Sequence, residues 1–302
     1  MRRIIFILPF VAFAMISCNK EVNDFQTDVD DIGVPLVING ISADLELQTK
    51  ASSTNYSISK GLGIFVEDEE GNVYYDQESC INNKLAGAAS NSIAPNSGTI
   101  YLYKKNAVLY SYYPYNENIT DITKIPIEIT RNDNFFYGTP VSGINSTNNY
   151  AEINLNIPYS ELVFELYQDY SYSLSGLVSR IAIQGENICA SGILNAKTGN
   201  FSSVEGLNEV IEYDFEPFLI KDSTWETHKY IKFICNGESK ITNIYFTIDD
   251  QDYVLQTDET AYEPGKSYKL YITLKGSTLG MGRIKINSVH WNSINSESYD
   301  LK

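Results

Sequence analysis

The sequence predicts an all-β chain of two tandem β-sandwich domains, and three observations support this fold class. Tyrosine (23 residues) and phenylalanine (13 residues), which favour strands, are abundant. Short segments rich in Ile, Val, Tyr and Phe recur with turn residues between them, and no amphipathic run of helical length occurs between Val34 and Lys302. After a leader and a tether, about 265 of the 302 residues remain, which is enough for two domains of ordinary size.

The first domain is expected to open with a pair of strands that turns at Asn39-Gly40. Apolar residues alternate with others on both sides of this turn, at Leu36, Ile38, Leu45 and Leu47. A hairpin follows, in which Gly63–Val66 and Val73–Tyr75 are joined through Gly71-Asn72. The four acids at its tip, Glu67–Glu70, indicate a solvated loop, because the alternating oxygen ligands of a calcium loop are missing.

Further strands are expected up to the middle of the chain. Thr99–Leu102 and Ala107–Tyr113 are predicted to form a pair. Ile125–Ile129 alternates clearly, and Pro126, which has no N–H, suits the edge of a sheet. The stretch 139–150, rich in Pro, Ser, Gly, Asn and Thr, indicates a loop.

The second half of the chain repeats this pattern. A second sheet system is predicted to begin with the strand Ala151–Leu155. Strands of five to eight residues at this spacing are typical of β-sandwiches. We therefore expect domains at 34–156 and 157–302, with the boundary near Asn156. The predicted strands are Ala151–Leu155, Leu162–Leu166, Ser179–Gln184, Tyr230–Cys235, Ile241–Ile248, Tyr253–Gln256, Tyr268–Leu274 and Arg283–Trp291.

The N-terminus carries the features of an exported lipoprotein. Arg2 and Arg3 precede an apolar run from Ile4 to Ile16, which is too short to cross a bilayer core as a helix. The small residue Ser17 then stands before Cys18, as a lipobox requires, so we expect a signal peptide at 1–17 and lipidation of Cys18. An ordinary signal peptide that happens to end beside a cysteine is the alternative.

The segment 18–33 is predicted to be a flexible tether, because it is acidic and has little apolar surface. The whole chain has a formal net charge of −16, which disfavours nucleic acid as a partner. These features together predict an exported protein that is held on a membrane by its lipid.

The cysteines and histidines do not form a pattern that indicates a metal site or an active site. Cys80, Cys189 and Cys235 lie in no CxxC pair and near neither histidine, so we expect buried free thiols, with a disulfide as the alternative. No Gly-x-Ser-x-Gly elbow or phosphate-binding loop accompanies His228 or His290. The acids at Asp249, Asp250 and Asp252 could serve a glycosidase, although a hairpin turn explains them better. We expect no catalytic residue, no cofactor and no metal.

A series of motifs runs in a fixed order through both halves of the chain. They are Thr49-Lys50-Ala51, Gly61–Val66, Leu109–Tyr115, Asn132–Gly138, Ile183-Gln184-Gly185, Ala190-Ser191-Gly192, Lys197–Asn200, Pro264–Leu274 and Ile284–Trp291. In this order, and behind a lipobox, they resemble the fimbrillin family, the lipoprotein-derived type V pilus subunits of Bacteroidales. The resemblance covers nearly the whole mature chain. It fails at Ile157–Phe164, where the family often has a histidine and small residues.

The resemblance implies a transthyretin-like fold in both domains and a function as a structural pilus subunit that supports adhesion. Subunits of this family are trimmed by a trypsin-like surface protease and polymerise by donor-strand exchange. The implied partners are neighbouring pilus subunits in a homo- or hetero-polymer, the outer membrane, that protease, and a host or bacterial glycan or protein receptor. A non-polymerising anchor or tip subunit is an alternative within the family.

Lys50 is the predicted cleavage site, with Ala51 as the new N-terminus. The polar segment Gln48–Ser59 has no strong strand signal, so a protease can bind it in an extended form. The cut would remove the apolar face of the leading segment. An ordinary loop lysine in a subunit that keeps its lipid is the alternative.

The C-terminal segment is the predicted donor strand. A bulge near Asn287-Ser288 would bring its apolar residues to one face. Arg283–Trp291 is also explained as the last strand of its own domain, in which case Asn292–Lys302 would be the mobile donor. The candidate donor residues are Ile284, Ile286, Val289, Trp291, Ile294, Tyr299 and Leu301.

A lipid-anchored glycan-binding protein is the competing hypothesis from another functional class. Exposed aromatic side chains are its expected binding platforms, although aromatic residues of sandwiches are more often part of the core. The candidates are Tyr112, Tyr113, Tyr115, Trp225 and Trp291.

Overall fold

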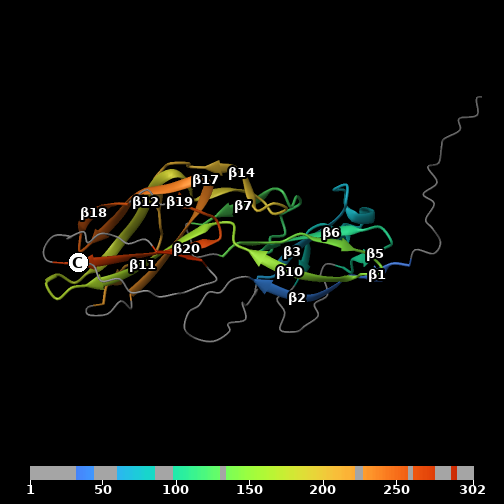
Figure 1. Ribbon diagram of the computed structural model, residues 1–302, viewed down its shortest axis with the longest axis horizontal. Coiled ribbons are helices and arrows are strands. Elements are labelled where there is room, and N and C mark those ends of the chain that lie inside the picture. Colours follow the sequence, from blue (N-terminus) through green and yellow to red (C-terminus); the bar gives the residue numbers. More distant parts are fainter. Residues whose placement is uncertain are drawn as a thin grey trace, which may run out of the picture. The chain divides into compact units, whose positions relative to one another are not determined.

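The computed structural model describes residues 32–43, 60–85, 98–129, 134–221, 227–257, 261–275 and 287–290. Regular structure in these residues is almost entirely β, which confirms the predicted fold class (Figure 1). The exceptions within these ranges are two short 3-10 helices, η1 (Tyr74–Asp76) and η2 (Glu78–Cys80). In this part of the chain, no helix has the length and apolar character that crossing a membrane requires. The number of domains and their transthyretin-like arrangement stay predictions.

Most strands before Ser160 build one seven-stranded sheet and a small two-stranded one. Their bounds are β1 (Val34–Pro35), β2 (Val37–Ala43), β3 (Leu62–Asp68), β4 (Asn83–Leu85), β5 (Tyr101–Leu102), β6 (Ala107–Tyr113), β8 (Phe136–Gly138), β9 (Val141–Ile144) and β10 (Tyr150–Asn156). The large sheet has the order β2-β10-β8-β6-β3-β4, and β9 also pairs with β6. β2 runs parallel to β10, whereas β1 and β5 form a separate antiparallel pair.

Most strands after Asn156 build a nine-stranded sheet that has a hydrophobic core of its own. Their bounds are β11 (Ser160–Gln168), β12 (Leu177–Cys189), β15 (Ile211–Glu212), β16 (Phe218–Leu219), β17 (Thr227–Ile248), β18 (Gln251–Gln256), β19 (Ala261–Tyr262), β20 (Lys266–Leu274) and β21 (Asn287–His290). The order is β15-β12-β17-β11-β20-β21. The first part of β17 pairs with β11 and its last part pairs with β12 and β18. Phe164 on β11 therefore meets Phe246 on β17, with ring centroids 5.2 Å apart.

A three-stranded sheet joins residues from the two halves of the chain. It consists of β7 (Ile125–Glu128), β13 (Ser191–Asn195) and β14 (Asn200–Glu205), in the order β14-β13-β7. β7 lies at its edge, which confirms the prediction from Pro126. The prediction that Ala151–Leu155 starts the second sheet system is wrong, because β10 belongs to the first sheet. The predicted boundary near Asn156 falls between β10 and β11, and its role as a domain boundary stays a prediction.

Two predicted strand pairs have other partners in the structure. Asn39-Gly40 forms no turn, because β2 continues through it and pairs with β10 across a register shift. Tyr101 and Leu102 do not pair with β6; they pair with the leading strand β1. In both cases the alternation of apolar residues identifies a strand and its buried face, but it says nothing about a partner far along the chain.

Two further predictions in the first half are corrected by side-chain and backbone contacts. Tyr74 belongs to η1 and not to a strand. In this position its ring is buried and its hydroxyl donates a 2.6 Å hydrogen bond to the carbonyl of Lys105. The stretch predicted as a loop contains β9, which pairs with β6. Ser142 lies opposite Val108 and Ile144 opposite Ala107, so Gly143 is the extra residue of a bulge, with φ +74°.

Candidate assembly interface

The leading segment of the described chain closes the edge of the seven-stranded sheet. β2 is the end strand of that sheet, with β10 as its neighbour. The segment is held at its start by hydrogen bonds outside the strand ladder. The Leu36 N–H donates to the Ile100 carbonyl at 2.8 Å, and the Asn149 side-chain amide donates to the Pro35 carbonyl at 2.7 Å. An end strand of this kind can be replaced without breaking the rest of its sheet.

Two apolar side chains of this segment are part of the first hydrophobic core. Leu36 and Ile38 are 3% and 0% exposed. The register places Ile38 beside Ala151 and Ile41 beside Ile153 on β10. Burial of an aliphatic side chain of this size contributes about 1.5–3 kcal/mol. Removal of the segment would therefore expose an apolar seat on β10 next to unpaired backbone groups.

The residues of β10 that seat the leading segment were not predicted as functional residues. Ala151, Ile153 and Leu155 are buried and alternate along the strand, so the sequence identifies them as core residues. Their pairing with β2 links positions more than a hundred residues apart in parallel. No local signal in the sequence indicates such a pairing.

The predicted lipidation and cleavage sites lie outside the described residues. Cys18 precedes them, and Lys50 and Ala51 fall in the gap between β2 and β3. The position of Lys50 in the chain still has a consequence, because a cut there separates β1 and β2 covalently from all later strands.

One predicted donor residue, Val289, lies in a described strand. The backbone of β21 pairs antiparallel with β20, with Val289 opposite Ser267, and β21 is the end strand of its sheet. This pairing within one chain fits the alternative that Arg283–Trp291 ends its own domain. The remaining candidates, Ile284, Ile286, Trp291, Ile294, Tyr299 and Leu301, lie outside the described residues. The donor role stays a prediction.

The described aromatic candidates for glycan binding are not free platforms. Tyr112 is 1% exposed, and its hydroxyl donates a 2.7 Å hydrogen bond to the Asn82 side chain. Tyr113 stacks on Phe136, and the ammonium of Lys84 lies 5.0 Å from the Tyr115 ring centroid. Trp225 and Trp291 lie outside the described residues.

Asp249, which was considered as a catalytic acid, is held by hydrogen bonds within the fold. The two oxygens of Asp249 accept hydrogen bonds from the hydroxyls of Tyr172 and Ser175 and from the N–H groups of Gly176 and Leu177. These bonds lower the pKa of Asp249 against the opposing effect of burial. Asp249 and Asp250 form the turn between β17 and β18, which confirms the hairpin prediction. Across the described ranges, no three side chains of His, Cys, Asp or Glu gather as metal ligands would.

The three cysteines of the described chain are buried free thiols, as predicted. The register places Cys189 opposite Ile234 and Ile188 opposite Cys235. Because successive side chains of a strand point to opposite faces, Cys189 packs in the first core and Cys235 in the second. Two thiols on opposite faces of the paired strands cannot approach to disulfide distance, so a disulfide between them is excluded.

The fold and this interface define a class of all-β protein in which a chain-leading strand completes the edge of a packed sheet. The chain belongs to the fimbrillin-like family, whose model matches residues 23–288. A comparison with curated proteins finds no match.

Solved structures share the fold at low sequence identity. A protein assigned to cell adhesion from Bacteroides uniformis superposes with a TM-score of 0.62 and 17% identity, over 86% of this chain and 99% of that one. Another such protein from Bacteroides ovatus gives 0.60 and 15%, over 85% and 96%. A fimbrial protein from Bacteroides vulgatus gives 0.53 and 10%, over 85% and 99%.

Proposed function

We propose that the chain is a structural subunit of a fimbria at the cell surface that supports adhesion. It is exported as a lipoprotein through Cys18 to the outer membrane and assembles with neighbouring subunits by strand exchange. Membership of the fimbrillin-like family and the fold shared with fimbrial and adhesion proteins support this function. The observation that carries the exchange step is the leading strand β2, which lies at a sheet edge and buries Ile38.

The proposed trigger is proteolysis after Lys50 by a trypsin-like surface protease. Loss of the preceding residues would leave the outer edge of β10 without its ladder partner and open the seat of Leu36 and Ile38. A buried backbone group left unpaired costs about 1–3 kcal/mol. An incoming strand from the next subunit would restore both the ladder and the apolar contacts, and its alternate side chains would fix the register.

The proposed donor is the C-terminal segment of the neighbouring subunit. Its end from Asn292 to Lys302 follows β21, which is itself an end strand, so the donor would leave the subunit without crossing another strand. A chain that lacks 292–302 is expected to fold as a soluble monomer and to form no filament. Filaments of that truncated chain, seen by electron microscopy, would refute this donor assignment.

The trigger is tested by limited trypsin digestion of the purified protein. Cleavage is expected to create an N-terminus at Ala51 and to produce filaments, as read by mass spectrometry and electron microscopy. Lys50→Gln should block both results, whereas Lys104→Gln, in the loop between β5 and β6, should block neither. Filaments of the Lys50→Gln protein with an intact leading segment would overturn the proposed trigger.

Mass spectrometry of the N-terminus of the protein in fimbriae taken from the cell surface distinguishes a shaft subunit from an anchor subunit. An anchor keeps its lipid and needs no cut, so its N-terminus would remain Cys18 in the assembled fimbria. A shaft subunit would begin at Ala51.

A further inference from the structure

The ammonium group of Lys232 contacts a side-chain amide that lies far away in the sequence. Lys232 is 7% exposed on β17, and its Nζ donates a 2.6 Å hydrogen bond to Oδ1 of Asn134, 98 positions earlier. The centroid of the Tyr159 ring lies 5.3 Å from the same ammonium. Because Oδ1 is bonded to the amide carbon Cγ, a small rotation of the lysine side chain brings Nζ to the distance of nucleophilic attack, about 3–3.5 Å from Cγ.

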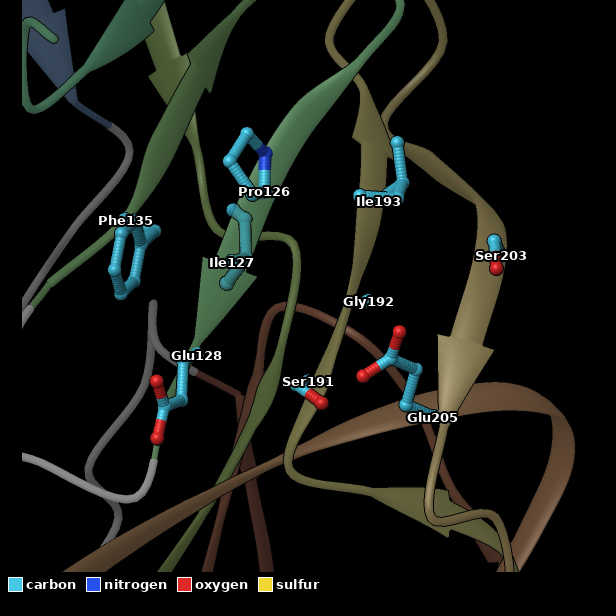
Figure 2. A pocket seen from close by; sticks show the side chains of 9 residues that line it. All are labelled: Pro126, Ile127, Glu128, Phe135, Ser191, Gly192, Ile193, Ser203 and Glu205. Atoms are coloured by element: carbon cyan, nitrogen blue, oxygen red, sulfur yellow. The ribbon is translucent and has the colours of Figure 1, made fainter.

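The position of Asn134 is set by the residues that follow it. Phe135 packs against the first core and lines, with Pro126 and Ile127 of β7, the pocket shown in Figure 2. From Phe136 the chain continues as β8. Asn134 itself is exposed, so a small molecule released from its amide can leave directly to solvent.

A buried carboxyl group lies beside the lysine. The strand register places Glu161 on β11 directly opposite Lys232 on β17, and the side chains of such a pair share one face, with Cβ atoms about 4.5–5.5 Å apart. Glu161 is 5% exposed, and burial raises its pKa to about 7 although the charge of Lys232 lowers it. Because both charges are poorly solvated, transfer of a proton from the lysine to the carboxylate costs less here than in water. That transfer produces a neutral amine, which is a nucleophile.

We propose that Lys232 and Asn134 become joined by an isopeptide bond in the folded chain, with Glu161 as the proton carrier. Glu161 first takes a proton from the Lys232 ammonium, and the neutral Nζ attacks Cγ of Asn134. The hydroxyl of Tyr159, which donates a 3.2 Å hydrogen bond to Oδ1, stabilises the negative charge that forms on this oxygen. Glu161 then passes its proton to Nδ2 and accepts one from Nζ. The Nζ–Cγ bond replaces the Cγ–Nδ2 bond, ammonia leaves, and no further reactant is needed.

The bond would connect the segment before β8, in the first sheet, to β17 in the second. A covalent link between distant residues restricts the unfolded chain, as a disulfide does, and an amide is not broken by reductants. The reaction also removes a buried charge, because the product amide is neutral. This inference rests on the contacts of Lys232 and does not depend on the proposed strand exchange.

The test is peptide mapping of the purified full chain by mass spectrometry after incubation at neutral pH. The expected product is a linked pair of peptides that contains Asn134 and Lys232 and is lighter than the two separate peptides by one ammonia. Lys232→Arg keeps the cation but removes the nucleophile, so it should abolish the link. Glu161→Gln should slow formation of the link at least about a hundredfold. Glu165→Gln is the matched control, since it removes the next buried acid on the same face of β11 and should leave the link intact.

Two outcomes would overturn the proposal. The first is recovery of the Asn134 and Lys232 peptides from the wild-type protein only in unlinked form, which would show that their contact is an ordinary hydrogen bond. Loss of ammonia from Asn134 alone counts as this outcome, because it leaves the Lys232 peptide free. The second is link formation at the wild-type rate in Glu161→Gln, which would show that Glu161 carries no proton. Should that variant fail to fold, Tyr159→Phe replaces it, and an unchanged rate in this variant would contradict the proposed stabilisation of Oδ1.

Discussion

The ammonium of Lys197 lies 2.5 Å from the carboxylate of Glu67, and this ion pair connects the β13–β14 turn to strand β3 of the first sheet. Both side chains are largely buried, at 26% and 13% exposure. The same ammonium lies 5.0 Å from the centroid of the Tyr110 ring. Gly199 in this turn has φ +76°, and a Cβ there would meet the Tyr137 ring at 2.2 Å. The turn is therefore closely packed against the first half of the chain.

Lys197→Met should destabilise the protein by about 1–3 kcal/mol, because it leaves the Glu67 carboxylate poorly solvated and without its cation. Chemical denaturation measures the loss. The double variant with Glu67→Gln should recover part of it, because no buried charge then remains unpaired. Lys124→Met is the matched control, since the Lys124–Asp121 pair is exposed and its loss should have little effect. Equal effects of the two lysine variants would contradict the structural importance of the buried pair.

The prediction that Glu67–Glu70 forms a solvated loop is wrong for Glu67 and Asp68, because both carboxylates form ion pairs with lysines far away in the sequence. Glu67 pairs with Lys197, and Asp68, which is 8% exposed, pairs with Lys105 at 2.8 Å. Four consecutive acids are ordinarily a solvent-exposed feature. The cations that bind them lie 37 and 130 positions away in the sequence, so no local pattern could identify them.

Stability should decrease with acid in a manner that depends on Asp68. The hydrogen bond from Lys105, together with bonds from Asn72 and Glu70, lowers the pKa of Asp68 from 3.8 to about 2 against the effect of burial. A carboxyl with a lowered folded-state pKa stabilises the fold above its unfolded pKa, and this contribution is lost as the pH falls from about 4 to about 2. Asp68→Asn lacks this contribution at every pH. The difference in unfolding free energy between the two proteins should therefore shrink from pH 5 to pH 2, and a constant difference would contradict the assignment.

Glu161 should have the opposite pH dependence. It is 5% exposed on β11 and accepts a 3.1 Å hydrogen bond from Ser267, and burial raises its pKa to about 7 although the charge of Lys232 opposes this. Because the folded state holds the proton more tightly, this group reduces stability as the pH rises from about 4.5 to about 7. Glu161→Gln should remove that decrease. Thermal unfolding at pH 5 and pH 8 tests this, and a wild-type protein that gains stability relative to the variant at pH 8 would refute it.

The sequence predicted the strands of this chain better than their arrangement. Tyr230–Cys235 and Ile241–Ile248 are predicted from the sequence as separate strands. In the structure they are one strand, β17. Strand β12 pairs with β17 on both sides of the junction between them, and register shifts at Gly185 and Ile188 accommodate the extra residues of β17. The parallel neighbours of β2 and β11, and the shared sheet of β7 with β13, also needed contacts between distant parts of the chain. Alternation determines which face of a strand is buried, whereas the partner depends on tertiary packing.

The buried thiols should react only after unfolding. Burial raises the pKa of Cys80 to about 12, and those of Cys189 and Cys235 to about 11. The thiolate is the reactive form, so both low access and low ionisation protect these residues at pH 8. Peptide mapping after iodoacetamide treatment should show the three cysteines unmodified in the folded protein and modified in denaturant. A disulfide-linked peptide between Cys189 and Cys235 in folded protein that is denatured with iodoacetamide already present and without reductant, so that free thiols are blocked before they can pair, would contradict their placement on opposite faces.

The leading strand should be the least protected strand of the first sheet, and Ile38→Ala should weaken it further. Ile38 is fully buried against the residues of β10, and loss of such a side chain costs about 2–4 kcal/mol. Because β2 is an end strand, most of this loss should appear as local opening of β2, while the inner strands β6 and β10 keep their amide protection. Hydrogen exchange followed by mass spectrometry measures both. Val37→Ala is the control, since the Val37 side chain is half-buried on the opposite side of the strand.

Under the proposed exchange, Ile38→Ala should also form filaments faster after trypsin treatment, because the departing strand is held less tightly. Uniform loss of protection across the whole sheet would show instead that β2 unfolds only together with its sheet, and a strand of that kind could not be exchanged.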